Sequence, residues 1–313
     1  MTPIAVAATA IVLIILSLSL QDSGNKSNKN TIISSDNKTS ASVIVDHEDP
    51  SYTENRVGKK PPQAGIYIPL YTSPDIDEIR GEWNRVIEAK KNHPNVPFIV
   101  TINPASGPGR QQNMAYVEAI HELKSAGIEN ILGYIPTDYG VGSQNGARSM
   151  EDIKQMMDQY KSWYPEVNGL MLDEVSSSES KLEFYSELEK YARSIGYTYI
   201  RGNPGTRPAE GYLQIFDNVS IYEGREAPSI SDLAISTYHN NNNNSSSYPR
   251  TLFSFTARDI ADLDLEYLNE VTNSVFYLYL TDDVEREDDQ NPYNSLPTYF
   301  EDLVKFLDDI EAE

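Results

Sequence analysis

The chain has 313 residues and a formal net charge of −22, with no cysteine and 39% hydrophobic residues, enough for a substantial core. The lack of cysteine excludes disulfides, thiolate metal sites and cysteine nucleophiles. The strong negative charge argues against nucleic acid as a partner, because phosphate binding requires a basic surface, and it suits a protein outside the cell, a salty environment or a cationic partner.

The N-terminus carries an apolar segment. Residues 3–20 contain no charged side chain and consist mainly of Ile, Leu, Val and Ala. The run is long for the core of a signal peptide and approaches the length of a membrane span. We therefore expect residues 1–20 to be a signal peptide or a membrane anchor, with the following domain secreted or held at the cell surface.

A polar segment follows at residues 21–64. It is rich in Ser, Asn, Lys, Thr and Asp and is nearly free of aromatic residues. Such a segment cannot bury enough apolar surface to order itself. We interpret it as a disordered linker that holds a folded domain clear of a membrane or wall.

From residue 65 onward, short β-rich runs alternate with segments of helical periodicity. We predict strands at 65–71, 97–102, 130–136, 169–173, 197–201, 218–223, 250–255 and 273–280. We predict helices at 76–92, 111–126, 150–163, 181–195, 209–215, 229–236 and 296–310. This α/β alternation over about 250 residues predicts a (β/α)8 TIM barrel at 65–313, with a doubly wound open sheet as the alternative.

Motifs for metals and phosphates are weak. The loop at 103–109 is rich in Gly and Pro but lacks the lysine of a phosphate-binding loop. The acidic loop at 282–289 lacks the glycine and spaced glutamate of an EF-hand, so we interpret it as solvated surface. An asparagine-rich loop at 239–245 is interpreted as a polar insertion. The four histidines have no ligand spacing, so we expect no metal and no cofactor.

Polar side chains follow several of the predicted strands. The apolar run at 168–172 ends in Asp173 and Glu174, and the sixth strand ends in Glu223. Barrel enzymes place their chemistry at this end of the strands, although an Asp or Glu here could instead cap the next helix. The remaining candidates, which we expect to bind substrate, are Tyr67, Asn103, Ser106, Tyr134, Tyr139, Asn203 and Tyr222.

This set of carboxylates, amides and tyrosines suits a sugar, whose hydroxyls need polar partners and whose ring face stacks on aromatics. Glycoside hydrolysis needs two carboxyl groups. Asp173 and Glu174 are adjacent and diverge in a regular strand, so Glu223 is the better partner for one of them. We take all three as catalytic candidates. The alternative is a non-catalytic glycan-binding or adhesion module on the same scaffold.

Several motifs together carry a resemblance to a known family. They are the segments at 67–71, 103–109, 133–140 and 169–174, the turn at 203–205 and the pair at 222–223. On these residues the domain resembles the spherulin-4-like proteins, grouped as glycoside hydrolase family 135. The resemblance implies a (β/α)8 fold, an active site at Asp173, Glu174 and Glu223, and endo-acting hydrolysis of α-1,4-linked N-acetylgalactosamine in a galactosamine-containing exopolysaccharide.

From these observations we expect a monomer whose partner is a polysaccharide. Partial deacetylation would make such a polymer cationic, and the acidic charge of this chain would then attract it. We expect no nucleic-acid partner, and membrane attachment only through the N-terminal segment.

Overall fold

The computed structural model describes residues 64–75, 77–142, 144–233, 248–284 and 291–310. The predicted signal peptide or anchor, the asparagine-rich loop and all of the predicted linker except Ala64 lie outside these ranges. Within them, no helix is long and apolar enough to cross a membrane.

Eight parallel strands form a closed barrel in chain order. The strands are β1 (Gly65–Leu70), β2 (Phe98–Ile102), β3 (Asn130–Pro136), β4 (Gly169–Asp173), β5 (Tyr199–Asn203), β6 (Asn218–Gly224), β7 (Phe253–Ala257) and β8 (Tyr277–Leu280). The barrel closes where Gly65 and Ile66 of β1 pair with Tyr277 and Leu278 of β8. The predicted (β/α)8 fold is therefore confirmed, and the open sheet is excluded because it would leave β1 and β8 as unpaired edges.

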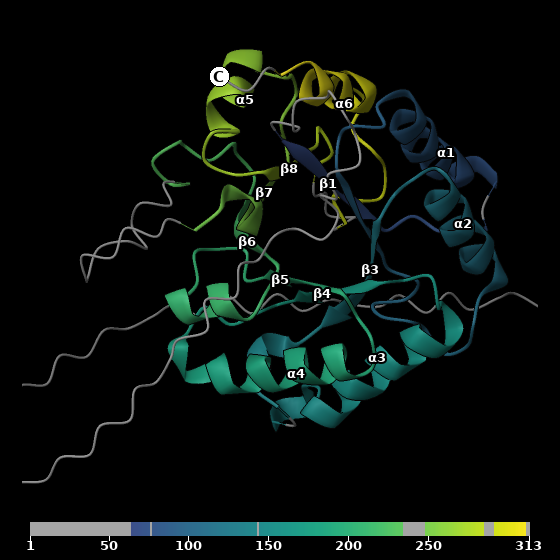
Figure 1. Ribbon diagram of the computed structural model, residues 1–313, viewed down its shortest axis with the longest axis vertical. Coiled ribbons are helices and arrows are strands. Elements are labelled where there is room, and N and C mark those ends of the chain that lie inside the picture. The colour runs from purple at the N-terminus through teal and green to yellow at the C-terminus, as the bar shows by residue number, and fades with distance from the viewer. Residues whose placement is uncertain (1–63, 76, 143, 234–247, 285–290, 311–313) are drawn as a thin grey trace, which may run out of the picture. The chain divides into compact units, whose positions relative to one another are not determined.

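Six α-helices cover the outside of the barrel. They are α1 (Asp77–Asn92), α2 (Met114–Ser125), α3 (Met150–Trp163), α4 (Leu182–Ser194), α5 (Leu265–Val271) and α6 (Phe300–Asp309) within the described residues. In Figure 1 the pairs α1–α2, α3–α4 and α5–α6 lie on three sides of the strands. Local signals set their starts: Ser149 and Asp152 form a capping box at α3, and the Asn113 side chain accepts from the Ala115 amide at α2.

Several predicted boundaries in the second half of the chain are wrong. The helix predicted at 209–215 is the short 3₁₀ helix η4 (Glu210–Gln214), and the described part of 229–236 forms a turn. Arg250–Leu252 is a 3₁₀ turn (η6) rather than the start of a strand, and β8 begins four residues later than predicted. Helix α5 was not predicted. Its seven residues are too few for a helical period to stand out.

Two apolar layers hold the barrel together. One lies between the strands and the helices and includes Trp83, Tyr160 and Phe253. The other fills the barrel interior with the side chains of Tyr67, Ile99, Leu132, Met171, Tyr199, Phe276, Tyr277 and Tyr279. Burying each large side chain contributes roughly 1.5–3 kcal/mol. The interior is therefore a packed core and not a pore.

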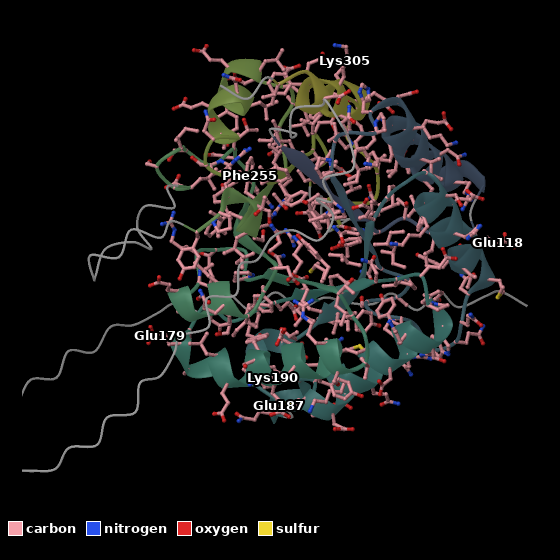
Figure 2. All side chains as sticks on the ribbon, viewed as in Figure 1. Glu118, Glu179, Glu187, Lys190, Phe255 and Lys305 are labelled. Carbon is pink, nitrogen blue, oxygen red and sulfur yellow. The ribbon has the colours of Figure 1, made fainter. Side chains whose placement is uncertain are left out.

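Charged side chains lie mainly on the outer surface. Figure 2 shows Glu118, Glu179, Glu187, Lys190 and Lys305 projecting from the helical shell. Among the described residues, the few fully buried polar side chains include Arg201 inside the barrel. In the described part of the chain, acidic side chains thus lie mainly on solvated faces, apart from the carboxylates at the mouth.

Candidate active site

The carboxyl ends of β4, β5 and β6 bring three predicted residues together. Asp173 of β4 is in register with Asn203 of β5. The Asn203 amide nitrogen donates to Asp173 Oδ1 at 2.7 Å and to Glu223 Oε2 at 2.8 Å. Because both oxygens bond to the same nitrogen, their separation cannot exceed the sum of these distances, 5.5 Å. One amide therefore fixes two carboxyl groups side by side.

A β-bulge aims Glu223 into the mouth. In the pairing of β6 with β7, Ser220 lies opposite Ser254. The next residue, Ile221, has no partner, so that Tyr222 pairs with Phe255 and Glu223 pairs with Thr256. This extra residue shifts by one position the alternation of side chains between the inside and the outside of the barrel. Without this shift Tyr222 would face inward and Glu223 outward, since side chains alternate along a strand.

Two tyrosines donate hydrogen bonds to the second oxygen of each carboxyl group, the one that Asn203 does not contact. The Tyr134 hydroxyl of β3 donates to Asp173 Oδ2 at 2.8 Å, and the Tyr293 hydroxyl donates to Glu223 Oε1 at 2.7 Å. Between them, the Tyr71 ring makes edge contacts with both, at centroid distances of 5.5 Å to Tyr134 and 5.8 Å to Tyr293. Each carboxyl group thus accepts one hydrogen bond from a hydroxyl and one from the shared amide.

Glu174 leaves the strand in a different direction. Its φ is 54°, in the left-handed region that is costly for a residue with a side chain. Its backbone carbonyl accepts from the Tyr139 amide at 2.8 Å, and its Oε2 accepts from the Asp138 amide at 3.2 Å. Asp138 is in turn paired with the Arg148 guanidinium at 3.0 Å. Glu174 therefore sits at the rim toward the β3–α3 loop.

Burial and mutual repulsion favour protonated carboxyl groups in this site. Asp173 is surrounded by protein, although part of its surface reaches the mouth; burial first, and then the charge of Glu223, raises its pKa. Burial, followed by the charges of Asp173 and Asp138, raises the pKa of Glu174. Burial and the neighbouring carboxylates also raise the pKa of Tyr134 and Tyr293, which therefore remain hydrogen-bond donors.

The other predicted substrate-binding residues are spread over the mouth, the interior and the outside. Tyr139 is 57% exposed at the rim, and burial and the charges of Glu174 and Asp173 raise its pKa. Asn103 Oδ1 accepts from the Gly107 amide at 3.0 Å, which shapes the loop that carries the exposed Ser106.

Two predicted residues lie below or outside the mouth. Tyr67 is buried inside the barrel, with the Arg201 guanidinium carbon 3.7 Å from its ring centroid. Tyr222 points to the outside because of the bulge, and its hydroxyl donates to the Glu226 carbonyl at 2.8 Å. The structure therefore does not bring Tyr222 together with the other candidates.

Sequence reasoning placed Tyr71 at the end of the first strand but did not carry it into the substrate-binding candidates, and it did not select Tyr293. Tyr71 directly follows β1, so its place at a strand end was a usable signal. Tyr293 lies in the loop between β8 and α6, where no periodicity or strand end marks it. Within the described residues, no group of three or more metal-ligating side chains is arranged to hold an ion.

The fold and this arrangement define a class: a (β/α)8 barrel with paired carboxyl groups at the ends of β4 and β6. The family model described as spherulation-specific family 4 matches residues 65–307. The chain therefore belongs to this family, and the resemblance seen in the sequence is confirmed.

Individual proteins agree with this assignment. Spherulin-4 from Physarum polycephalum is 35% identical over 160 residues, which cover 50% of this chain and 44% of that protein. The match thus spans less than half of the relative. The crystal structure of Aspergillus clavatus Sph3 in complex with GalNAc aligns with a TM-score of 0.65 and 20% identity, covering 79% of this chain and 98% of that chain. This second likeness shows a shared fold.

Proposed function

We propose that the protein is a glycoside hydrolase that cleaves an amino-sugar polysaccharide, with Asp173 and Glu223 as the reacting pair. The observation that carries this proposal is the single Asn203 amide, which holds Asp173 Oδ1 and Glu223 Oε2 within 5.5 Å of each other at the barrel mouth. Retaining glycosidases have their carboxyl groups about 5–5.5 Å apart, whereas inverting enzymes leave roughly 6.5–9.5 Å for a water molecule. The spacing supports a retaining reaction.

The pair supplies both functions that such a reaction needs. One carboxyl group, protonated, gives its proton to the glycosidic oxygen, while the other, ionised, attacks the anomeric carbon. The carbon–oxygen bond breaks, the leaving chain departs as an alcohol, and a glycosyl ester remains on the protein. The first group, now a carboxylate, takes a proton from water, and the water oxygen displaces the ester. In the resting protein the raised pKa of Asp173 favours the proton on that member of the pair.

The surrounding residues have separate roles in this proposal. Glu174 places a third carboxylate at the rim, where it accepts hydrogen bonds from sugar hydroxyl or amino groups. The exposed Tyr139 ring offers a face on which a sugar stacks. Asn103 and Ser106 line the neighbouring loop, while Tyr67 supports the site from below. Tyr222 does not contact the substrate in this proposal, because its side chain points to the outside of the barrel.

The substrate class rests on family membership and on charge. The related Sph3 structure contains GalNAc, which supports an N-acetylgalactosamine or galactosamine polymer as substrate. We further propose that the acidic domain, exported by its N-terminal segment, attracts a partly deacetylated, cationic form of this polymer. Turnover of the deacetylated polymer should then fall as salt is added. Turnover that is insensitive to salt would contradict this part of the proposal.

The proposal is tested by incubating the protein with α-1,4-linked N-acetylgalactosamine polymer and measuring new reducing ends. We expect Asp173→Asn and Glu223→Gln each to lower turnover at least about 10³-fold, because each removes a group that acts in the transition state. Matched surface variants, Asp158→Asn on α3 and Glu187→Gln on α4, should retain activity. Binding of the polymer by the wild-type protein without new reducing ends would contradict hydrolysis and favour the glycan-binding module.

A further inference from the structure

Tyr293 reaches the carboxyl pair from the long connection between β8 and α6. Its hydroxyl bonds Glu223 at 2.7 Å, and its ring contacts those of Tyr71 and Tyr279. Its own backbone amide donates to Asn291 Oδ1 at 3.1 Å, which forms a tight local turn. The side chain is thus held both at its ring and at its backbone.

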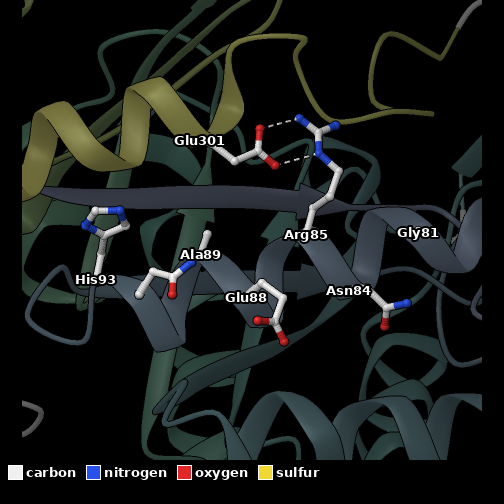
Figure 3. Close-up of a pocket in the computed structure, with 8 residues that line it drawn as sticks. Gly81, Asn84, Arg85, Glu88, Ala89, His93 and Glu301 are labelled. Carbon is white, nitrogen blue, oxygen red and sulfur yellow. Dashed lines mark hydrogen bonds and ion pairs between the residues drawn. The ribbon is translucent and has the colours of Figure 1, made fainter.

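The segment that carries Tyr293 is anchored to the helical shell a few residues later. The Leu296 amide donates to Glu82 Oε2 at 2.9 Å, and the Pro297 carbonyl accepts from the Arg85 guanidinium at 3.0 Å. Arg85 also forms two 2.8 Å hydrogen bonds with Glu301 of α6. Figure 3 shows this Arg85–Glu301 pair at one side of the pocket between α1 and α6. One arginine therefore joins α1, α6 and the backbone close to Tyr293.

We infer that Tyr293 is a positioning residue that orients Glu223 for the reaction, and that Arg85 stabilises the segment that delivers it. The inference rests on the proposed glycoside hydrolysis. Glu223 has two carboxyl oxygens, and the Asn203 amide fixes only one of them. Without the Tyr293 hydroxyl, the group can rotate about that single hydrogen bond. A misplaced carboxyl group cannot line up with the anomeric carbon or the glycosidic oxygen.

The two ends of the carboxyl pair are fixed in different ways. Asp173 is held by Tyr134, whose position is set by β3, a strand of the barrel. Glu223 is held by Tyr293, whose position is set by the anchored segment. The Tyr71 ring contacts both tyrosines, so that a shift of one is limited by the other. The orientation of Glu223 therefore depends on contacts far from the mouth, including those of Arg85.

The test compares Tyr293→Phe with Tyr299→Phe. Both variants keep the ring and lose one hydroxyl, but the Tyr299 hydroxyl donates to the Ile260 carbonyl at 2.8 Å, away from the carboxyl pair. We expect Tyr293→Phe to lower kcat roughly ten- to a hundredfold with KM nearly unchanged, the effect of losing a hydrogen bond to a charged group. Tyr299→Phe should change neither.

A second variant tests the contacts by which Arg85 holds the segment that carries Tyr293. Arg85→Ala should lower kcat several-fold with KM nearly unchanged, whereas Lys91→Ala, on the same helix, should leave both unchanged. An unchanged kcat in Tyr293→Phe, beside an active wild type, would overturn the inference and leave hydrolysis intact. A rise in KM alone would also overturn it, because that result assigns Tyr293 to substrate binding. An inactive wild type would instead overturn the proposed function. In that case, the unfolding free energies of Tyr293→Phe, Tyr299→Phe and wild type test the hydrogen bond itself, because its loss should destabilise the protein.

Discussion

The two halves of the barrel differ in how they are built. From β1 to β4, each strand is followed by a regular helix of 12 to 16 residues. From β5 to β8, the described connections contain the five-residue η4, the seven-residue α5 and the ten-residue α6, and β6 carries a bulge. The regular half supplies Asp173 and Tyr134, whereas the irregular half supplies Asn203, Glu223 and Tyr293. The comparison suggests that the first half provides a fixed reference against which irregular backbone aims the second carboxyl group.

The largest effect that would sharpen this comparison is expected at Asn203, which joins the two halves. Asn203→Ala removes both hydrogen bonds that hold Asp173 and Glu223 together, so that the distance between the two groups is no longer fixed. We expect turnover to fall roughly a hundredfold, the usual cost of a misplaced reacting group. The exposed Asn84→Ala on α1 serves as the control. Activity in Asn203→Ala close to that of the wild type would show that the amide does not set the spacing.

A second prediction compares glycines in the two halves. An added Cβ at Gly169 of β4 would lie 2.4 Å from the Tyr199 carbonyl oxygen, and one at Gly202 of β5 would lie 2.4 Å from the Phe216 ring. Backbone in the sheet cannot yield, whereas a ring beside η4 can tilt. We expect each alanine substitution to cost about 1–3 kcal/mol in unfolding free energy, with Gly169→Ala the more costly. Denaturant unfolding measures both, and a larger loss for Gly202→Ala would contradict the view that the second half adapts more easily.

The smallest expected effect concerns stability and pH. The pKa of Asp173 is higher in the folded than in the unfolded protein, so protonation of Asp173 favours the folded state. This contribution is fully present at pH values below the pKa of the unfolded state and is lost as the pH rises through the pKa of the folded state. Asp173→Asn removes the buried charge, so we expect it to be more stable than wild type by about 1 kcal/mol at neutral pH. The difference should disappear in acid.

Asp152 of α3 provides a control for this measurement, because its pKa is lowered whereas that of Asp173 is raised. Hydrogen bonds from Ser149 lower its pKa, so its contribution is present above the unfolded pKa and is lost in acid. Asp152→Asn should therefore be less stable than wild type at neutral pH and should match it in acid. If Asp173→Asn followed the pattern expected for Asp152→Asn, burial and repulsion would not govern Asp173.

The same contrast explains how far the sequence could predict the molecule. The strands β1 to β4 and helix α3 agree with the predicted limits to within a residue, because buried strands and long amphipathic helices leave clear periodic patterns. The patterns fail where 3₁₀ turns replace helices. Strand position alone brought Asp173, Asn203 and Glu223 into one list of candidates.

The details of the site depend on features that leave no periodic pattern in the sequence. Ile221 looks like any strand residue, yet the bulge there decides that Glu223 faces the mouth and Tyr222 the outside. Tyr293 comes from an irregular segment, and its place beside Glu223 is set by tertiary contacts with α1 and α6. The left-handed conformation of Glu174 also depends on contacts with the β3–α3 loop.

The central claim is that one amide holds two carboxyl groups close enough for direct attack on the sugar. The most direct test is to follow hydrolysis by proton NMR and to identify the anomeric configuration of the first product before it mutarotates. The spacing of at most 5.5 Å between Asp173 Oδ1 and Glu223 Oε2 predicts an α-configured product from an α-linked polymer, through net retention. A β-configured first product would contradict the account, because inversion requires room for a water molecule between the two groups.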